Sequence, residues 1–229
     1  MWYFDPVYFW YVFIPTILIS LGVQVYLRST FNKWSKVKNG LGISGAQVGQ
    51  QLVQRTSLNP VKLERVPGTL SDHFDPRANT VRLSDTIASQ PTIAAMAVTA
   101  HELGHVQQYQ TGSGLITMRN FLMPALQFSP TISYFAIFFG LFWNMTGLLW
   151  VGIFFFGVMV VFSILTLPVE LDASRRAMRM LDEAGLTVNE TDRQGARQML
   201  NAAALTYLAA AVTSVLQLLY YIRLAQRRR

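Results

Sequence analysis

Ala100-His101-Glu102-Leu103-Gly104-His105 is an H-E-x-x-H motif inside residues 92–108, which we expect to form a helix. On a helix, His101 and His105 lie four positions apart, so both imidazoles leave the same face and can bind one metal ion. Glu102 is placed beside them to take a proton from water rather than to bind the metal. Two histidines can also fall four apart by chance. The chain has only three, however, and two of them flank a glutamate in the one spacing that this chemistry uses.

The residues before the motif predict how its helix begins. Ser89 is the expected N-cap, and Pro91 falls in the first turn, where its missing N–H is not needed. Small side chains at residues 94–100 allow another element to pack closely against the helix.

A catalytic zinc site needs three protein ligands and an open position for water. The chain contains no Cys, so the third ligand is either His73 or a carboxylate. Glu170 is the best carboxylate, because we expect Pro168 to open a helix that presents Glu170 in its first turn. Asp172 follows closely and is a candidate partner for a ligating imidazole.

The composition indicates a membrane protein. Of the 229 residues, 52% are hydrophobic and only 14% are charged, which is more apolar than an ordinary soluble domain. The net charge of +7 comes from basic residues that cluster beside apolar runs. This pattern favours membrane orientation over nucleic-acid binding, for which we would expect a basic face with interleaved aromatic residues.

The first apolar stretch, residues 7–27, contains no charge and is long enough to cross a bilayer. It lacks a basic n-region and a small-residue cleavage site, so we expect a retained anchor. Aromatic residues that predict an interfacial belt stand at one end: Trp2, Tyr3, Tyr8, Trp10 and Tyr11. Basic residues that place the other end in the cytoplasm follow it: Arg28, Lys33, Lys36 and Lys38.

Residues 39–114 have a soluble composition and are expected to form a small catalytic part around the motif helix. Ser44 and Gln47 predict a capping box that opens a helix reaching Arg55. Short strands are expected over residues 61–66, 70–74 and 80–83, the last two joined by a turn. An exposed strand edge beside the site could bind an extended peptide, although the strands could equally be scaffold.

His73 could stabilise the transition-state oxyanion or contact substrate, and it could also be a hydrogen-bonded surface residue beside a turn. Tyr109, just past the motif, has the same two interpretations. Asp72, Asp75 and Asp85 are close enough in sequence to suggest a second metal, but aspartates in turns usually cap backbone N–H groups.

Two further apolar arms, residues 121–142 and 148–167, are expected to form a transmembrane hairpin around a short polar turn at residues 144–147. Two crossings return the chain to the side that it left. Glu170 is thereby expected on the same face of the membrane as His101 and His105, as a shared metal requires.

The remaining chain is expected to be helical over residues 168–200, where residues 182–185 (DEAG) end one helix and Thr191 caps the next, and to continue through residues 202–222. This last stretch is either a fourth crossing or a helix lying at the interface or against the catalytic part. A fourth crossing would put a basic tail on the side opposite the active site, against the positive-inside rule. That tail comprises Arg223, Arg227, Arg228 and Arg229.

Five stretches of the chain together carry a resemblance to a known family: residues 29–35 (STFNKWS), 68–77 (GTLSDHFDPR), 100–105 (AHELGH), 167–176 (LPVELDASRR) and 203–207 (AALTY). On these stretches, nearly the whole chain resembles the YugP-like neutral zinc metallopeptidases of bacterial membranes. It implies a multi-pass membrane metallopeptidase with zinc on His101 and His105 and with Glu102 as the base. Other membrane peptidases take their third ligand from the Glu of an E-x-x-x-D run; here Ser174 stands where that Asp would be.

We therefore expect a multi-pass α-helical membrane protein with a small α+β zincin-like catalytic domain and its active site on the cytoplasmic side. It would cleave peptide or protein substrates, including membrane proteins, with Zn²⁺ on His101, His105 and Glu170. The alternative is a non-catalytic membrane scaffold or regulator with a structural zinc. Retention of Glu102 argues against it, because a structural site needs no base. An intramembrane protease is a third interpretation, which the polar Gln107 and Gln108 disfavour.

Overall fold

A computed structural model describes residues 5–68 and 71–228. Trp2, Tyr3, Leu70 and Arg229, on which some expectations rested, lie outside the described residues. The structure is mostly helical with one small sheet, and it divides into two compact units. One consists of Met1–Gln24, Thr117–Pro168 and Thr206–Arg229, and the other of Val25–Ile116 and Val169–Leu205.

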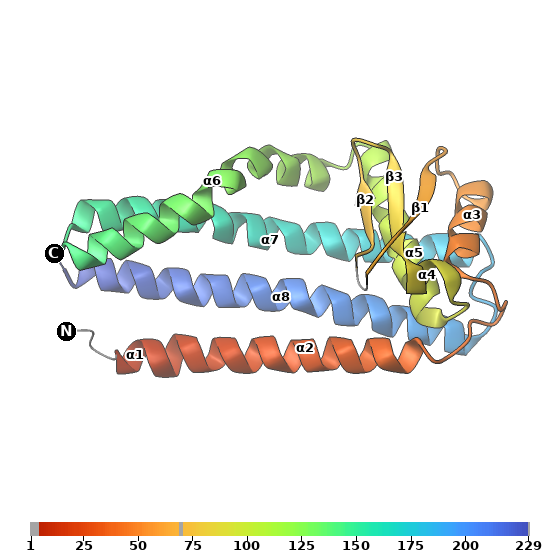
Figure 1. Cartoon of the computed structure of the whole chain (residues 1–229), viewed down its shortest axis with the longest axis horizontal. Helices are drawn as coiled ribbons and strands as arrows, with labels where there is room; N and C mark the ends of the chain where they lie inside the picture. The colour runs from red at the N-terminus through yellow and green to blue at the C-terminus, as the bar shows by residue number, and fades with distance from the viewer. Residues whose placement is uncertain (1–4, 69–70, 229) are drawn as a thin grey trace. The chain divides into compact units, whose positions relative to one another are not determined.

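Within the described residues, four helical stretches are long and apolar enough to cross a membrane (Figure 1). The first, Pro6–Trp34, is made of α1 (Pro6–Tyr8), the π-helical turn η1 (Phe9–Phe13) and α2 (Ile14–Trp34). The others are α6 (Gly114–Phe142), α7 (Thr146–Glu183) and α8 (Glu190–Gln226). The expected helical arms are thus confirmed as helix, and each is longer than its apolar core.

The first unit is built around the hairpin of α6 and α7. A Cβ atom on Gly140 would lie 2.7 Å from the backbone nitrogen of Leu149, so glycine is needed where the two helices approach. The Ser133 hydroxyl donates to the Gly152 carbonyl at 3.0 Å, which joins the helices further down. Asn144 adopts a left-handed conformation in the turn, as expected for a plain polar turn at this position.

The second unit contains the sheet and the motif helix. Its helices include α3 (Gly45–Arg55), α4 (Asp85–Ser89) and α5 (Ile93–Gln110). The strands β1 (Lys62–Val66), β2 (His73–Asp75) and β3 (Thr80–Ser84) pair in the order β1-β3-β2, with β1 parallel and β2 antiparallel to β3 (Figure 1). Helix α5 contacts α3, α4, β2 and β3, and most of its side chains are buried. The motif therefore lies on the central helix of this unit.

The prediction that Ser89 caps the motif helix was wrong, because Ser89 belongs to the helix before it. Ser89 ends the short helix α4, and Thr92 is the N-cap of α5, with its hydroxyl accepting from the Ala95 N–H at 3.2 Å. The backbone carbonyl of Pro91 accepts from the Asn39 N–H at 3.0 Å, so the residues before Thr92 are held outside the helix. The capping box of Ser44 and Gln47 is confirmed, and α3 ends at Arg55 as expected.

Helix α7 corrects a second expectation. Pro168 does not open a new helix but lies inside α7, which continues through Glu170 to Glu183. Proline has a φ that suits a helix, but inside one it removes a hydrogen bond and its ring crowds the carbonyl of the residue four positions earlier. Packing compensates, because Val169, Ala173 and Ala177 beyond it are fully buried. Glu170 is therefore presented from the middle of a continuous helix.

The connection between α7 and α8 matches one expectation and corrects another. Gly185 takes the left-handed conformation that ends α7, as its sequence position predicted. The cap of α8 is Asn189, whose side-chain oxygen accepts from the Asp192 N–H at 2.8 Å, and not Thr191.

Candidate metal centre

Two helices of the second unit bring three side chains to one point. His101 and His105 lie on one face of α5 with their ring centroids 4.8 Å apart. The Nε2 atom of His101 is 3.2 Å from Oε2 of Glu170 on α7, and the Nε2 atom of His105 is 3.5 Å from the same oxygen. Glu170 is only 3% exposed. The three side chains form a group that could hold a metal ion.

The spacing of these atoms fits a single zinc ion. Zinc binds histidine nitrogen and carboxylate oxygen at about 2.0–2.2 Å in a tetrahedral arrangement, which separates two ligand atoms by about 3.3 Å. The two distances from imidazole nitrogen to carboxylate oxygen lie on either side of that value. Two imidazoles and a carboxylate are also a donor set typical of catalytic zinc, with one position left for water.

Glu102 lies next to His101 on α5 and outside this group of three. It is 8% exposed. Burial raises the pKa of its carboxyl above the ordinary value, and the neighbouring imidazoles of His101 and His105 oppose part of that shift. A carboxylate with a raised pKa holds an accepted proton more tightly, which suits a base that must deprotonate water.

Each candidate histidine ligand has a polar partner on its other ring nitrogen. Nδ1 of His101 lies 3.3 Å from the hydroxyl of Ser174, one turn beyond Glu170 on α7. Nδ1 of His105 lies 3.0 Å from the side-chain oxygen of Gln108. Such partners fix the orientation of a ligating imidazole.

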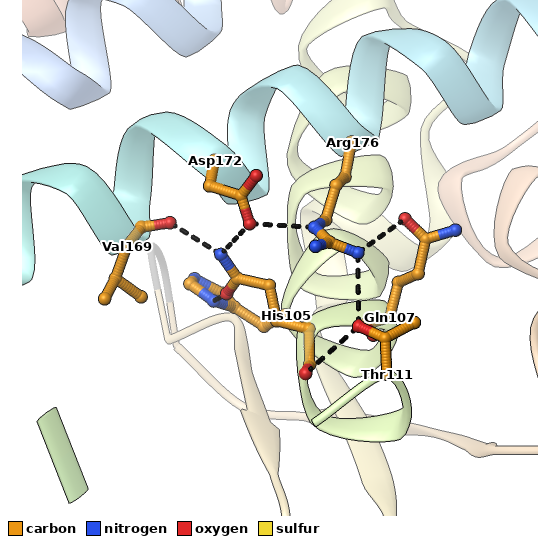
Figure 2. Close-up of polar contacts among 7 residues, drawn as sticks. His105, Gln107, Thr111, Val169, Asp172 and Arg176 are labelled. Atoms are coloured by element: carbon orange, nitrogen blue, oxygen red, sulfur yellow. Dashed lines mark hydrogen bonds and ion pairs between the residues drawn. The ribbon is translucent and has the colours of Figure 1, made fainter. Parts of the chain in front are cut away.

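Asp172, the partner expected from the sequence, does not contact an imidazole directly. Its carboxylate accepts from the side-chain nitrogen of Gln108 at 2.8 Å, and Gln108 in turn contacts His105 (Figure 2). Sequence reasoning missed Gln108 and Ser174 as partners. Gln108 follows His105 by three residues, which puts both on the same face of α5. Ser174 follows Glu170 by four residues, which puts both on the same face of α7.

His73 lies apart from the group of three. It is exposed on β2, and its ring nitrogen Nδ1 donates to the Ser71 carbonyl at 2.8 Å. Asp72 accepts from the N–H and hydroxyl of Ser84, and Asp75 accepts from the Arg77 N–H and from Arg82. These two aspartates therefore accept hydrogen bonds from backbone and side-chain donors. This agrees with the interpretation that they cap N–H groups in turns rather than bind a second metal.

Comparison with known proteins shows which family the chain belongs to. Residues 9–226 match the protein family described as "Putative neutral zinc metallopeptidase". The chain belongs to this family. It is also 34% identical to the "Putative membrane protease YugP" of Bacillus subtilis (strain 168) over 214 residues, which are 93% of this chain and 95% of that protein. No solved structure matches the chain.

The contact between α5 and α7 makes a first testable prediction at Gly104. A Cβ atom there would collide with the Ala173 carbonyl oxygen and lie 3.1 Å from its carbonyl carbon. We expect Gly104→Ala to destabilise the protein by about 1–3 kcal/mol, as overpacking of a core does. Zinc affinity should fall as well, because the added methyl group pushes Glu170 away from the histidines. Thermal unfolding and zinc titration measure the two effects.

Gly157→Ala is the matched control, since this glycine also lies inside a helix but has open space around its Cβ position. That variant should unfold and bind zinc as wild type does, or be slightly more stable. Equal behaviour of the two variants would show that the close approach at Gly104 is unimportant.

Proposed function

We propose that this protein is a membrane-anchored zinc metallopeptidase that hydrolyses peptide bonds. The convergence of His101, His105 and Glu170 from two helices, with the buried Glu102 beside them, is the observation that carries the proposal. Membership of the "Putative neutral zinc metallopeptidase" family supports it.

The side chains of the site have three roles in this proposal: metal ligand, general base and support of a ligand. His101, His105 and Glu170 would hold a zinc ion, which when bound would lower the pKa of a water molecule and polarise a carbonyl group. Glu102 accepts the proton of the attacking water and passes it to the leaving amine. Ser174, beside Nδ1 of His101, holds that imidazole in the orientation that points Nε2 toward Glu170.

The competing function is a membrane scaffold with a structural zinc. Structural zinc sites usually close all four positions with protein ligands, whereas this group offers three. A structural site also has no use for a buried carboxylate that stands beside the ligands without belonging to them. Both features favour catalysis.

Substrate would approach along the sheet in this proposal. Strand β2 is at an edge of the sheet and contacts α5, and its Phe74 ring packs edge-on against Tyr109 at 5.5 Å between centroids. An extended segment of a peptide or membrane protein would pair with that edge through backbone hydrogen bonds.

Metal analysis and cleavage assays on the purified protein test the proposal directly. Metal analysis should find zinc bound to the protein, and casein or a membrane protein should be cleaved. A chelator should abolish cleavage and added zinc should restore it. Protein that contains zinc but cleaves neither substrate, in wild-type form, would favour the scaffold.

The membrane topology provides a second testable prediction. The four apolar helices and the similarity to a protein named as a membrane protease support insertion into a membrane. The basic residues that follow the first apolar stretch favour a cytoplasmic site by the positive-inside rule. A reporter fused after Lys38 should be cytoplasmic, and one inserted at Asn144, in the turn between α6 and α7, should be on the far side. Paired reporters active on opposite sides of the membrane provide the measurement.

A fusion at Thr187, between α7 and α8, is the internal control and should behave like the fusion at Lys38. If the reporters at Lys38 and Asn144 lie on one side, the hairpin does not cross the bilayer. A reporter at the C-terminus would show whether α8 makes a fourth crossing.

A further inference from the structure

Gln108 uses both ends of its side-chain amide inside the protein. It is fully buried on α5, three residues after His105. Its oxygen lies 3.0 Å from Nδ1 of His105, and its nitrogen donates to the Val169 carbonyl and to the Asp172 carboxylate, each at 2.8 Å (Figure 2). The amide therefore links one candidate metal ligand on α5 to the segment of α7 that carries another.

The chemistry of these neighbours fixes which way the amide points. The Val169 carbonyl and the Asp172 carboxylate can only accept hydrogen bonds, so the NH₂ group of Gln108 must face them. The amide oxygen then faces His105 and can only accept. Nδ1 of His105 must accordingly carry a proton, so the neutral ring has its lone pair on Nε2, the nitrogen that lies 3.5 Å from Glu170.

Asp172 is itself held in place. The guanidinium of Arg176, one turn further along α7, donates to the Asp172 carboxylate at 2.8 Å. Another nitrogen of Arg176 contacts the Gln107 side chain at 3.4 Å and the Thr111 hydroxyl at 3.3 Å, at the end of α5 (Figure 2). The arginine thus orients the carboxylate that orients Gln108.

We propose that Gln108 is a positioning residue of the metal centre. It selects the ring tautomer of His105 that has Nε2 free for metal. It also fixes the position of that ring relative to Val169, the residue next to Glu170. One amide thereby aligns ligands from two helices. The inference rests on the zinc site of the proposed function, because it concerns how two of its ligands are held.

Zinc affinity of the full-length protein tests this role, measured by competition with a chelator. Gln108→Met keeps the length of the side chain and removes its hydrogen bonds. We expect it to weaken zinc binding by about 10–100-fold, the usual effect of losing a group that supports a metal ligand. Gln110→Met is the matched control, since this glutamine of the same helix exchanges hydrogen bonds with the backbone of Asn59 and lies outside this network. It should bind zinc like wild type.

A second measurement separates positioning from packing. The chain has three histidines, so ¹⁵N-histidine labelling reports on three rings. In the zinc-loaded wild type, the Nδ1 proton of His105 should be visible and protected from exchange with water, and in Gln108→Met it should exchange rapidly. A residue that merely packs would lower the melting temperature and leave both this proton and the zinc dissociation constant unchanged.

The wild type carries the test if Gln108→Met fails to fold. In the zinc-loaded protein, His105 should carry its ring proton on Nδ1, held by the Gln108 oxygen and protected from exchange with water. A His105 ring protonated on Nε2, or one whose Nδ1 proton exchanges rapidly, would overturn the inference.

The outcomes for the two proposals differ. Wild-type protein that binds no zinc overturns both the metallopeptidase function and the role of Gln108. Wild type that binds zinc, together with Gln108→Met of equal affinity and equal proton protection, overturns the role of Gln108 alone.

Discussion

Removing the Glu170 carboxylate is expected to abolish zinc binding. Glu170 is the buried group on which the Nε2 atoms of His101 and His105 converge, at 3.2 and 3.5 Å. Without it, two imidazoles remain, which leaves the ion one protein ligand short of a catalytic zinc site. The affinity of Glu170→Ala should fall by more than the roughly 10–100-fold that is typical for a supporting residue. Zinc titration of the purified variant measures the loss.

His73→Ala is the control for this experiment. His73 is the remaining histidine, but it is exposed on β2 and bonded to the Ser71 carbonyl. It should keep zinc at wild-type affinity, even if turnover slows because His73 contacts substrate. The opposite pattern, with zinc lost from His73→Ala and kept by Glu170→Ala, would move the third ligand to β2 and refute the assignment of Glu170.

Glu102→Gln should retain zinc and the fold but lose peptidase activity. The amide occupies the same buried space as the carboxylate, yet it cannot accept a proton from water. General-base catalysis contributes about 10²–10⁴-fold to a rate, so kcat should fall by a factor in that range. Steady-state cleavage of casein by matched, zinc-loaded preparations gives the comparison.

Zinc content and melting temperature of Glu102→Gln must be measured on the same samples. Equal values for the variant and wild type would assign any loss of activity to the missing base. Full turnover by a zinc-loaded Glu102→Gln would show that another group accepts the proton. A variant that has lost its zinc would instead place Glu102 among the ligands.

Local sequence patterns anticipated much of this structure. The H-E-x-x-H spacing on a helix, the capping box at Ser44 and the apolar arms each depend on residues close together in the chain, and each is present as helix or cap. Glu170 was placed near the histidines by counting the apolar arms, and the structure does bring the three residues together.

Features that depend on long-range contacts were missed. The residues before Thr92 read as a helix start, but pairing of Pro91 with Asn39 holds them outside the helix. Pro168 looked like a helix opener, whereas buried contacts of its neighbours keep α7 continuous. The partners of the imidazoles were misassigned because the choice between Asp172 and Ser174 depends on which side of α7 faces α5.

The separation of the ligands along the chain has a consequence for folding. His101 and Glu170 are 69 positions apart, so an ion bound to both acts as a cross-link that closes a long loop. Because a metal that binds only the folded state stabilises it, zinc at about 1,000 times its Kd adds about 4 kcal/mol to the free energy of unfolding. Depletion of zinc would therefore raise the fraction of unfolded protein as well as remove the activity. Cellular quality control would then degrade more of the zinc-free protein.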